Sequence, residues 1–120
     1  MRLPRERRIR ASADFTRLRQ QGSRLDCGPF LLNFRHTKSD VPARFAVIAA
    51  KKSIPLAVNR NRAKRLAREL FRADAAAFPP GWEIVLVIRP GMLRRRFADL
   101  KAAYALAATK LVAQAARQAE

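Results

Sequence analysis

The segment from Lys51 to Arg72 constrains the fold most, because it predicts a helix with one apolar and one cationic side. Five apolar residues recur at helical spacing: Ala63, Leu66, Ala67, Leu70 and Phe71. A stripe of this width seats a helix on a core. The other side carries an i, i+4 row of Arg60, Lys64, Arg68 and Arg72, with Asn61, Arg62 and Arg65 beside it and Glu69 as the only acid. We therefore expect this helix to pack against an apolar layer on one side and to be exposed to solvent on the other.

The composition of the cationic side favours phosphate binding over simple solvation. Solvated helix faces usually alternate acids and bases for i, i+4 support, whereas six bases against one acid repel each other. Arginine predominates, and its planar guanidinium binds phosphate through two parallel hydrogen bonds. Asn61 adds a donor and an acceptor suited to a base edge, a sugar hydroxyl or a phosphate of a folded RNA.

The charge of the whole chain points to a polyanionic partner. Its 120 residues, enough for a single domain, hold 26 basic and 9 acidic side chains, a formal net charge of +17. Such self-repulsion is tolerated mainly when a polyanion neutralises it, so nucleic acid or an anionic membrane is indicated. No apolar run is long enough to span a bilayer, and Met1–Arg10 leads into no apolar signal segment, which favours nucleic acid. The single cysteine, Cys27, excludes an intrachain disulfide and a cysteine zinc cluster and predicts packing in a reducing cytoplasm.

The first part of the chain predicts an arm, a helix and strands. Residues 1–10 form a basic arm, and Ser12 caps a helix from Ala13 to about Gln21 that Gly22 ends. Alternation of apolar and polar residues predicts a strand over Phe30–Arg35, and a short strand near 23–26 is compatible with the pattern. A polar loop over His36–Pro42 follows.

The second part of the chain contains a further strand, the cationic helix, a buried strand and a long helix. The next strand covers Arg44–Ala50, and the cationic helix begins either with Ser53 as cap and Pro55 in its first turn or with Asn59 as cap. Pro79-Pro80-Gly81 precede an apolar β-branched run, Trp82–Arg89, typical of a central strand. The final helix starts at about Leu93 with an apolar stripe of Phe97, Leu100, Tyr104, Ala107, Leu111 and Ala115.

The order α-β-β-β-α-β-α predicts an α/β (α+β) two-layer sandwich with a central mixed sheet, in one domain of residues 1–120. Arg94–Arg96 would open the final helix, where positive charge opposes the helix dipole. They are either tolerated surface residues or part of an RNA footprint.

The residues needed to hydrolyse a phosphodiester do not cluster in the sequence. A general base, grouped carboxylates for metals or an activated nucleophile would be required. His36 is the only histidine, and the nine acids are spread singly from Glu6 to Glu120. We therefore predict no catalytic residues and no metal site in this chain, and His36 as an ordinary loop residue.

An ordered motif in the same region carries a resemblance to a known family. Lys51-Lys52, a short spacer, Arg60-Asn61-Arg62-Ala63-Lys64-Arg65-Leu66 and Arg68-Glu69-Leu70-Phe71-Arg72 resemble the signature of the protein subunit of bacterial ribonuclease P. The similarity extends from about Pro4 to the C-terminal helix. It implies that a catalytic RNA and its Mg²⁺ ions cleave precursor tRNA, while the protein binds that RNA and the 5′ leader. It also implies a left-handed βαβ crossover. From the sequence we infer no obligate protein partner.

The resemblance implies two sets of binding residues. The catalytic RNA would be contacted by Lys51, Lys52, Arg60, Asn61, Arg62, Lys64, Arg65, Arg68 and Arg72. The single-stranded leader would lie between the first helix and the sheet, near Phe15, Arg19, Asn33 and Arg35. Phe15 either stacks on a base, which contributes about 1–3 kcal/mol, or packs in the core.

Two positions depart from the family pattern, and two other functions compete with this one. Arg19 stands where a second aromatic is usual, and Ser53–Leu56 lack the glycine that many members carry after the lysine pair. The same charge would suit a structural RNA-binding protein, such as a ribosomal component, or a DNA-binding helix protein. Neither of these would need a leader site.

Overall fold

The structure is a computed structural model that describes residues 8–9, 22–37, 40–74 and 76–119. The predicted first helix, and with it Phe15 and Arg19, lies outside the described residues, as do most residues of the predicted basic arm. The placement of those elements stays a prediction.

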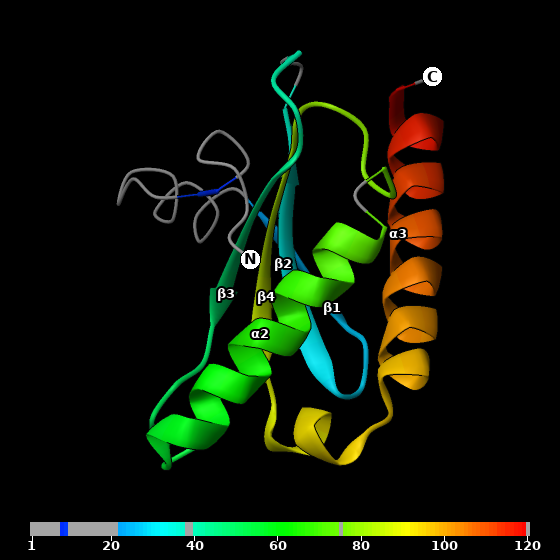
Figure 1. The fold of residues 1–120 in the computed structure, drawn as a ribbon. Helices are drawn as coiled ribbons and strands as arrows, with labels where there is room; N and C mark the ends of the chain where they lie inside the picture. The colour runs from blue at the N-terminus through cyan, green and yellow to red at the C-terminus, as the bar shows by residue number, and fades with distance from the viewer. Residues whose placement is uncertain (1–7, 10–21, 38–39, 75, 120) are drawn as a thin grey trace.

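The described chain folds into a mixed sheet covered on one face by two helices (Figure 1). Its elements, in order, are β1 (Ser23–Asp26), β2 (Phe30–His36), β3 (Arg44–Ile48), α2 (Ala57–Ala73), β4 (Trp82–Ile88), the 3₁₀ helix η2 (Pro90–Arg94) and α3 (Phe97–Ala119). The strands lie in the order β1-β2-β4-β3. The predicted two-layer α+β architecture is confirmed.

The apolar run that predicted a central strand forms β4. This strand pairs antiparallel with β2 and parallel with β3. Its core positions Ile84, Leu86 and Ile88 are at most 2% exposed. Continuous burial explains why the run is apolar rather than alternating.

The chain crosses from β3 through α2 to β4 in the left-handed sense. In Figure 1 both strands run downward, α2 lies in front of them, and β4 stands to the right of β3. Most βαβ crossovers are right-handed because strand twist favours that return path. The handedness implied by the family resemblance is therefore present in this structure.

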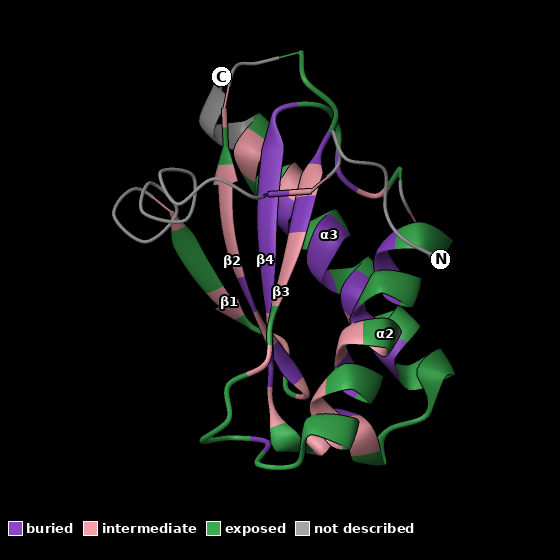
Figure 2. Ribbon diagram, turned by 60° about the vertical axis from the view of Figure 1, so that its left-hand side comes forward, coloured by how far each residue is buried: buried purple, intermediate pink, exposed green. Residues whose placement is uncertain are grey.

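One face of the sheet and the apolar stripes of both helices form the core. Phe30, Leu32 and Phe45 from the strands meet Leu70 of α2 and Tyr104 of α3 in one buried cluster. Figure 2 shows the two helices on the same side of a sheet whose central strand is buried. The predicted stripes are confirmed for the buried positions Ala63, Ala67, Leu70, Phe71, Leu100, Tyr104, Ala107 and Leu111.

The start predicted for the cationic helix is wrong in both versions. The N-cap position is Leu56, which makes no side-chain capping bond, and Ala57 is the first helical residue. Ser53 instead belongs to a turn in which its N–H donates to the carbonyl of Ala50 at 3.1 Å. Pro55 precedes the N-cap, so it is not a residue of the first helical turn. Its fixed φ restricts the backbone of the segment that leads into the helix.

Three further boundaries differ from the sequence prediction. Strand β2 includes His36, which the sequence pattern predicts in a loop, and β3 ends at Ile48 rather than Ala50. Helix α3 begins at Phe97, because Pro90 and the residues after it form η2 instead of the first turn of a long helix. Phe97 itself is 36% exposed and thus lies outside the buried stripe. Arg94–Arg96 precede α3 and so are not part of its first turn.

A hydrogen-bonded turn joins β1 to β2. Gly28 has a φ of +91°, a region that glycine enters without a steric cost. Its N–H donates to the Asp26 carboxylate at 2.9 Å, and Arg89 donates to the same oxygen at 2.7 Å. These bonds, the backbone one foremost, hold the pKa of Asp26 below its ordinary value.

Cys27 lies half-buried in this turn, and we expect its thiol to react slowly. Burial raises the pKa of the Cys27 thiol to about 11, and the thiolate is the reactive form. Because the pKa is raised in the folded state, the thiol contributes to folding stability at pH values below its ordinary pKa. This contribution is lost as the pH rises towards 11. At pH 8, alkylation of the folded protein by iodoacetamide should be much slower than alkylation in denaturant. Equal rates would show that the thiol is not protected.

Candidate nucleic-acid interface

The exposed side of α2 is a cationic surface from Asn61 to Arg72, after a first turn whose exposed residues are apolar. Because Ala63, Ala67 and Leu70 face the core, the opposite side is turned to solvent. It carries Asn61, Arg62, Arg65, Arg68 and Arg72, all of which are exposed. The only acid there is Glu69, which accepts a 3.4 Å ion pair from Arg72. We call these five exposed residues the α2 surface.

Two predicted members of the cationic row lie at the flank of α2. Arg60 and Lys64 are half-buried, because the i, i+4 row begins on the side of the helix nearer the core and turns towards solvent only at Arg68 and Arg72. The guanidinium of Arg60 donates from Nη1 to the carbonyl oxygens of Ile54 at 2.9 Å and Pro55 at 2.7 Å. Arg60 thus ties the entry loop to the helix. Its contact with RNA stays a prediction.

Lys51 and Lys52 are exposed in the turn that leads from β3 towards α2. The turn is held by the N–H groups of Ser53 and Ile54, which donate to the carbonyl of Ala50 at 3.1 and 2.9 Å. No acid stands in the first turn of α2. Helix N-termini attract anions, so the turn and the helix start present positive potential together.

The face of the sheet turned away from α2 and α3, here called the outer face, is organised in rows across the strands. Residues paired between neighbouring strands share a face. One row is Arg35, Glu83 and Arg44; the next is Arg24, Asn33, Val85 and Ala46; the third is Asp26, Leu31, Val87 and Ile48. Charged, mixed and largely apolar rows therefore follow one another along the strands. Ile9 packs on Val85 and leaves both side chains almost fully buried.

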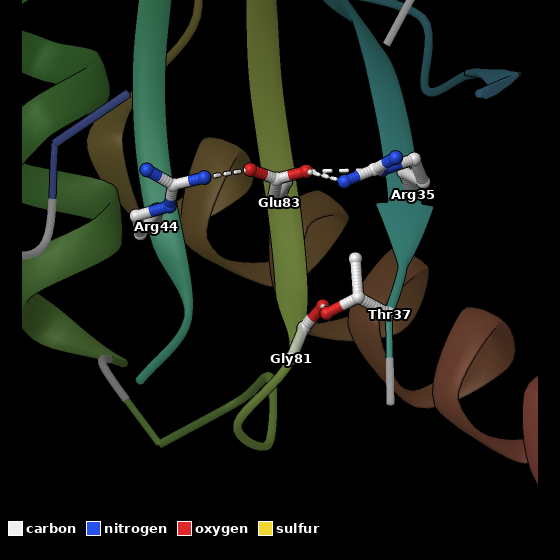
Figure 3. Close-up of polar contacts among 5 residues, drawn as sticks. All are labelled: Arg35, Thr37, Arg44, Gly81 and Glu83. Atoms are coloured by element: carbon white, nitrogen blue, oxygen red, sulfur yellow. Dashed lines mark hydrogen bonds and ion pairs between the residues drawn. The ribbon is translucent and has the colours of Figure 1, made fainter. Parts of the chain in front are cut away.

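Glu83 is a buried carboxylate held between two arginines (Figure 3). Arg35 of β2 donates to its Oε1 from Nε at 3.0 Å and from Nη2 at 2.8 Å. Arg44 of β3 donates to Oε2 from the other side. Sequence reasoning missed this group because the three residues are far apart in the chain. The only available signal was a lone acid at the start of an otherwise apolar strand.

The two remaining residues predicted to bind the leader lie on the outer face. Asn33 and Arg35 point to the same side of β2, in adjacent rows. Within the part of the chain that the structure describes, the buried Oδ1 of Asn33 has no hydrogen-bond partner. The α2 surface lies across the helical layer from the outer face. The sheet therefore separates the two predicted binding sites.

The described residues gather neither a metal site nor a membrane span. Nowhere in residues 8–9, 22–37, 40–74 and 76–119 do three or more His, Cys, Asp or Glu side chains cluster as metal ligands. None of the helices found there is both long and apolar enough to cross a bilayer.

The fold and these surfaces define a class: small α+β proteins in which a left-handed crossover carries a cationic helix across a mixed sheet. A family model described as Ribonuclease P matches residues 3–112. The chain belongs to this family of ribonuclease P protein components. It is thus part of an endoribonuclease holoenzyme for tRNA processing, in which its partner is RNA.

Individual relatives agree with this assignment. The ribonuclease P protein component of Clavibacter michiganensis subsp. michiganensis is 31% identical over 110 residues, covering 92% of this chain and 96% of the relative. That of Syntrophobacter fumaroxidans is 38% identical over 85 residues, 70% of each chain. The solved structure of the RNase P protein from Thermotoga maritima superposes with a TM-score of 0.70 at 28% identity, covering 81% of this chain and 90% of that one.

Proposed function

We propose that the α2 surface binds the RNA subunit of ribonuclease P. The observation that carries this proposal is an exposed helix side with four arginines and an asparagine against a single acid. Self-repulsion on such a surface is relieved when phosphates replace solvent, and each contacted phosphate releases counterions. Lys51 and Lys52, exposed just before the helix, extend the same positive potential.

The outer face is the proposed site of the precursor's 5′ leader. Its charged row suits phosphates, and its largely apolar row, which Ile9 does not cover, suits bases. Phe15 and Arg19, outside the described residues, belong to the same proposal through the family resemblance.

The chemistry is assigned to the RNA partner. Hydrolysis of a phosphodiester needs a base, a nucleophile or metal ligands, and the described residues gather no metal-ligand cluster. Mg²⁺, bound mainly by the RNA, would supply the activated water, while this chain neutralises phosphates and holds the leader. The complex would act in the cytoplasm on precursor tRNA, without an obligate protein partner.

Cleavage of precursor tRNA at low Mg²⁺ tests this proposal. A bacterial ribonuclease P RNA is assayed with the purified chain, without it, and the chain is assayed alone. We expect stimulation of the RNA and no cleavage by the chain alone. Cleavage by the chain alone would reveal a catalytic centre, and no stimulation would favour a structural RNA-binding protein instead.

Added salt should weaken binding to the RNA subunit steeply. For single-stranded contacts the slope of log affinity against log salt is about −0.7 per phosphate neutralised, and for duplex contacts it is about −0.9. The five α2-surface residues, four of them arginines, therefore predict a slope of several units. Titrations at a series of KCl concentrations measure it. A slope near zero would contradict an electrostatic interface.

A further inference from the structure

A groove lies at the β1 side of the molecule, between the strands and the second half of α3. It has a volume of about 680 Å³ and opens between the edge of the sheet and the helix. Its walls include His36 and Trp82 from the strand ends and Lys110 and Gln114 from α3, with Arg24 and Arg35 at the sheet edge. Ligand sites are typically about 300–1,000 Å³, so the groove is large enough for a nucleotide.

The groove combines a stacking platform with positive charge. The rings of His36 and Trp82 are stacked, with centroids 4.9 Å apart and planes inclined by 25°. Trp82 is almost fully buried while His36 is exposed, so the outer side of the imidazole faces solvent. Lys110 and Arg24 are exposed as well, and the described lining residues include no carboxylate. Cations beside a flat ring are the features that bind single-stranded nucleic acid without reading its sequence.

The groove continues from the outer face around the edge of the sheet. Arg24 pairs with Asn33 in the mixed row, and Arg35 belongs to the charged row with Glu83. Both arginines also line the groove. Strand β1 pairs with β2 only as far as Phe34, so among the described strands β2 itself forms the edge at Arg35 and His36. Helix α2 contacts β3 and β4, towards the other edge, which separates the groove from the α2 surface.

We propose that this groove binds nucleotides of the 5′ leader farther from the cleavage site than those on the outer face. The inference rests on the proposed leader site, because it extends the same RNA strand beyond the sheet edge. Lys110 would contact a phosphate, and His36 would stack with a base. The bound nucleotides would add affinity for long leaders without changing how short ones bind.

Leader length provides the test. The holoenzyme is titrated with precursor tRNAs that share one tRNA body and differ only in leader length. For the unmodified protein we expect tighter binding of long leaders, and Lys110→Ala should reduce that gain about tenfold, the effect of one charged contact worth about 1.5 kcal/mol. The salt slope for long leaders should fall by about 0.7. Short-leader affinity should not change.

A matched variant and a second readout complete the experiment. Lys101→Ala removes the same charge from an exposed position of α3 that does not line the groove, and should behave like the unmodified protein. Trp82 is the only tryptophan, so a leader oligonucleotide that reaches the groove should change its fluorescence, and Lys110→Ala should weaken that response.

The outcomes separate this inference from the proposed function. If Lys110→Ala leaves the length dependence and the fluorescence response intact, the groove proposal is overturned while leader binding on the outer face stands. If affinity does not depend on leader length at all, the groove is likewise excluded. If precursor and mature tRNA bind equally well even with short leaders, it is the outer-face proposal that fails.

Discussion

Replacing Arg65 and Arg68 together by alanine should lower the affinity for ribonuclease P RNA about 100-fold. Both side chains are exposed on the α2 surface. A charged hydrogen bond to phosphate contributes about 1.5 kcal/mol or more, and each 1.4 kcal/mol is tenfold in affinity. The fold should be unaffected, because the core stripe of α2 lies on its other side. Filter binding or fluorescence titration with the RNA subunit alone measures the change.

A control with the same loss of charge separates local contacts from net charge. Lys101→Ala/Lys110→Ala also removes two cations, from exposed positions of α3. With the RNA subunit alone, in the absence of precursor, it should bind within about threefold of the unmodified protein because only the long-range field changes. If the two double variants lose affinity equally, the interface is diffuse and the α2 surface has no special role.

Glu83→Ala should destabilise the protein by about 2 kcal/mol. Removing one partner of a fully buried ion pair costs about 3–5 kcal/mol, since a charge is left uncompensated. The arginine side chains here are 18% and 27% exposed, so water recovers part of that loss. For a domain of this size the melting temperature should fall by roughly 8 °C. Thermal and urea denaturation, followed by circular dichroism, provide the measurement.

Two further variants test whether the paired arginines cause this effect. Glu69→Ala removes an exposed carboxylate with one long ion pair to Arg72, and should cost less than about 0.5 kcal/mol. In a double-mutant cycle, Arg35→Ala and Glu83→Ala should couple by about 1 kcal/mol or more. Additive effects would mean that Glu83 stabilises the sheet by packing rather than through Arg35.

Most of the fold could be predicted because local pattern and tertiary packing agree along this chain. The β-branched run at 84–88 is apolar throughout, and a strand of this kind is buried on both sides only in the centre of a sheet. The apolar stripe of α2 required a packed layer on that side of the helix. The element boundaries were harder to predict. Capping and proline rules gave two starts for α2, yet the chain begins it at Leu56–Ala57 without a side-chain cap, where Arg60 binds the entry loop instead.

The cationic side of α2 was predictable as a whole but not residue by residue. Helical spacing alone could not show that the Arg60–Lys64 part of the row turns towards the core, because that depends on how the helix is seated on the sheet. The residues that meet on the outer face were harder still to predict. Asn33 and Arg35 were named from a strand pattern and a resemblance, whereas Glu83 and Arg44 went unnoticed until strand pairing brought them into one row.

By itself the sequence determined the class of element at nearly every described position, the excess of positive charge and the family. These depend on composition and on periods of two or 3.6 residues, which are local properties. Only the tertiary structure decided which side chains from different strands meet: the Arg35–Glu83–Arg44 row, the buried Asn33 oxygen and the groove beside Lys110. Strand order and register produce such contacts between residues distant in the chain, and no local pattern specifies them.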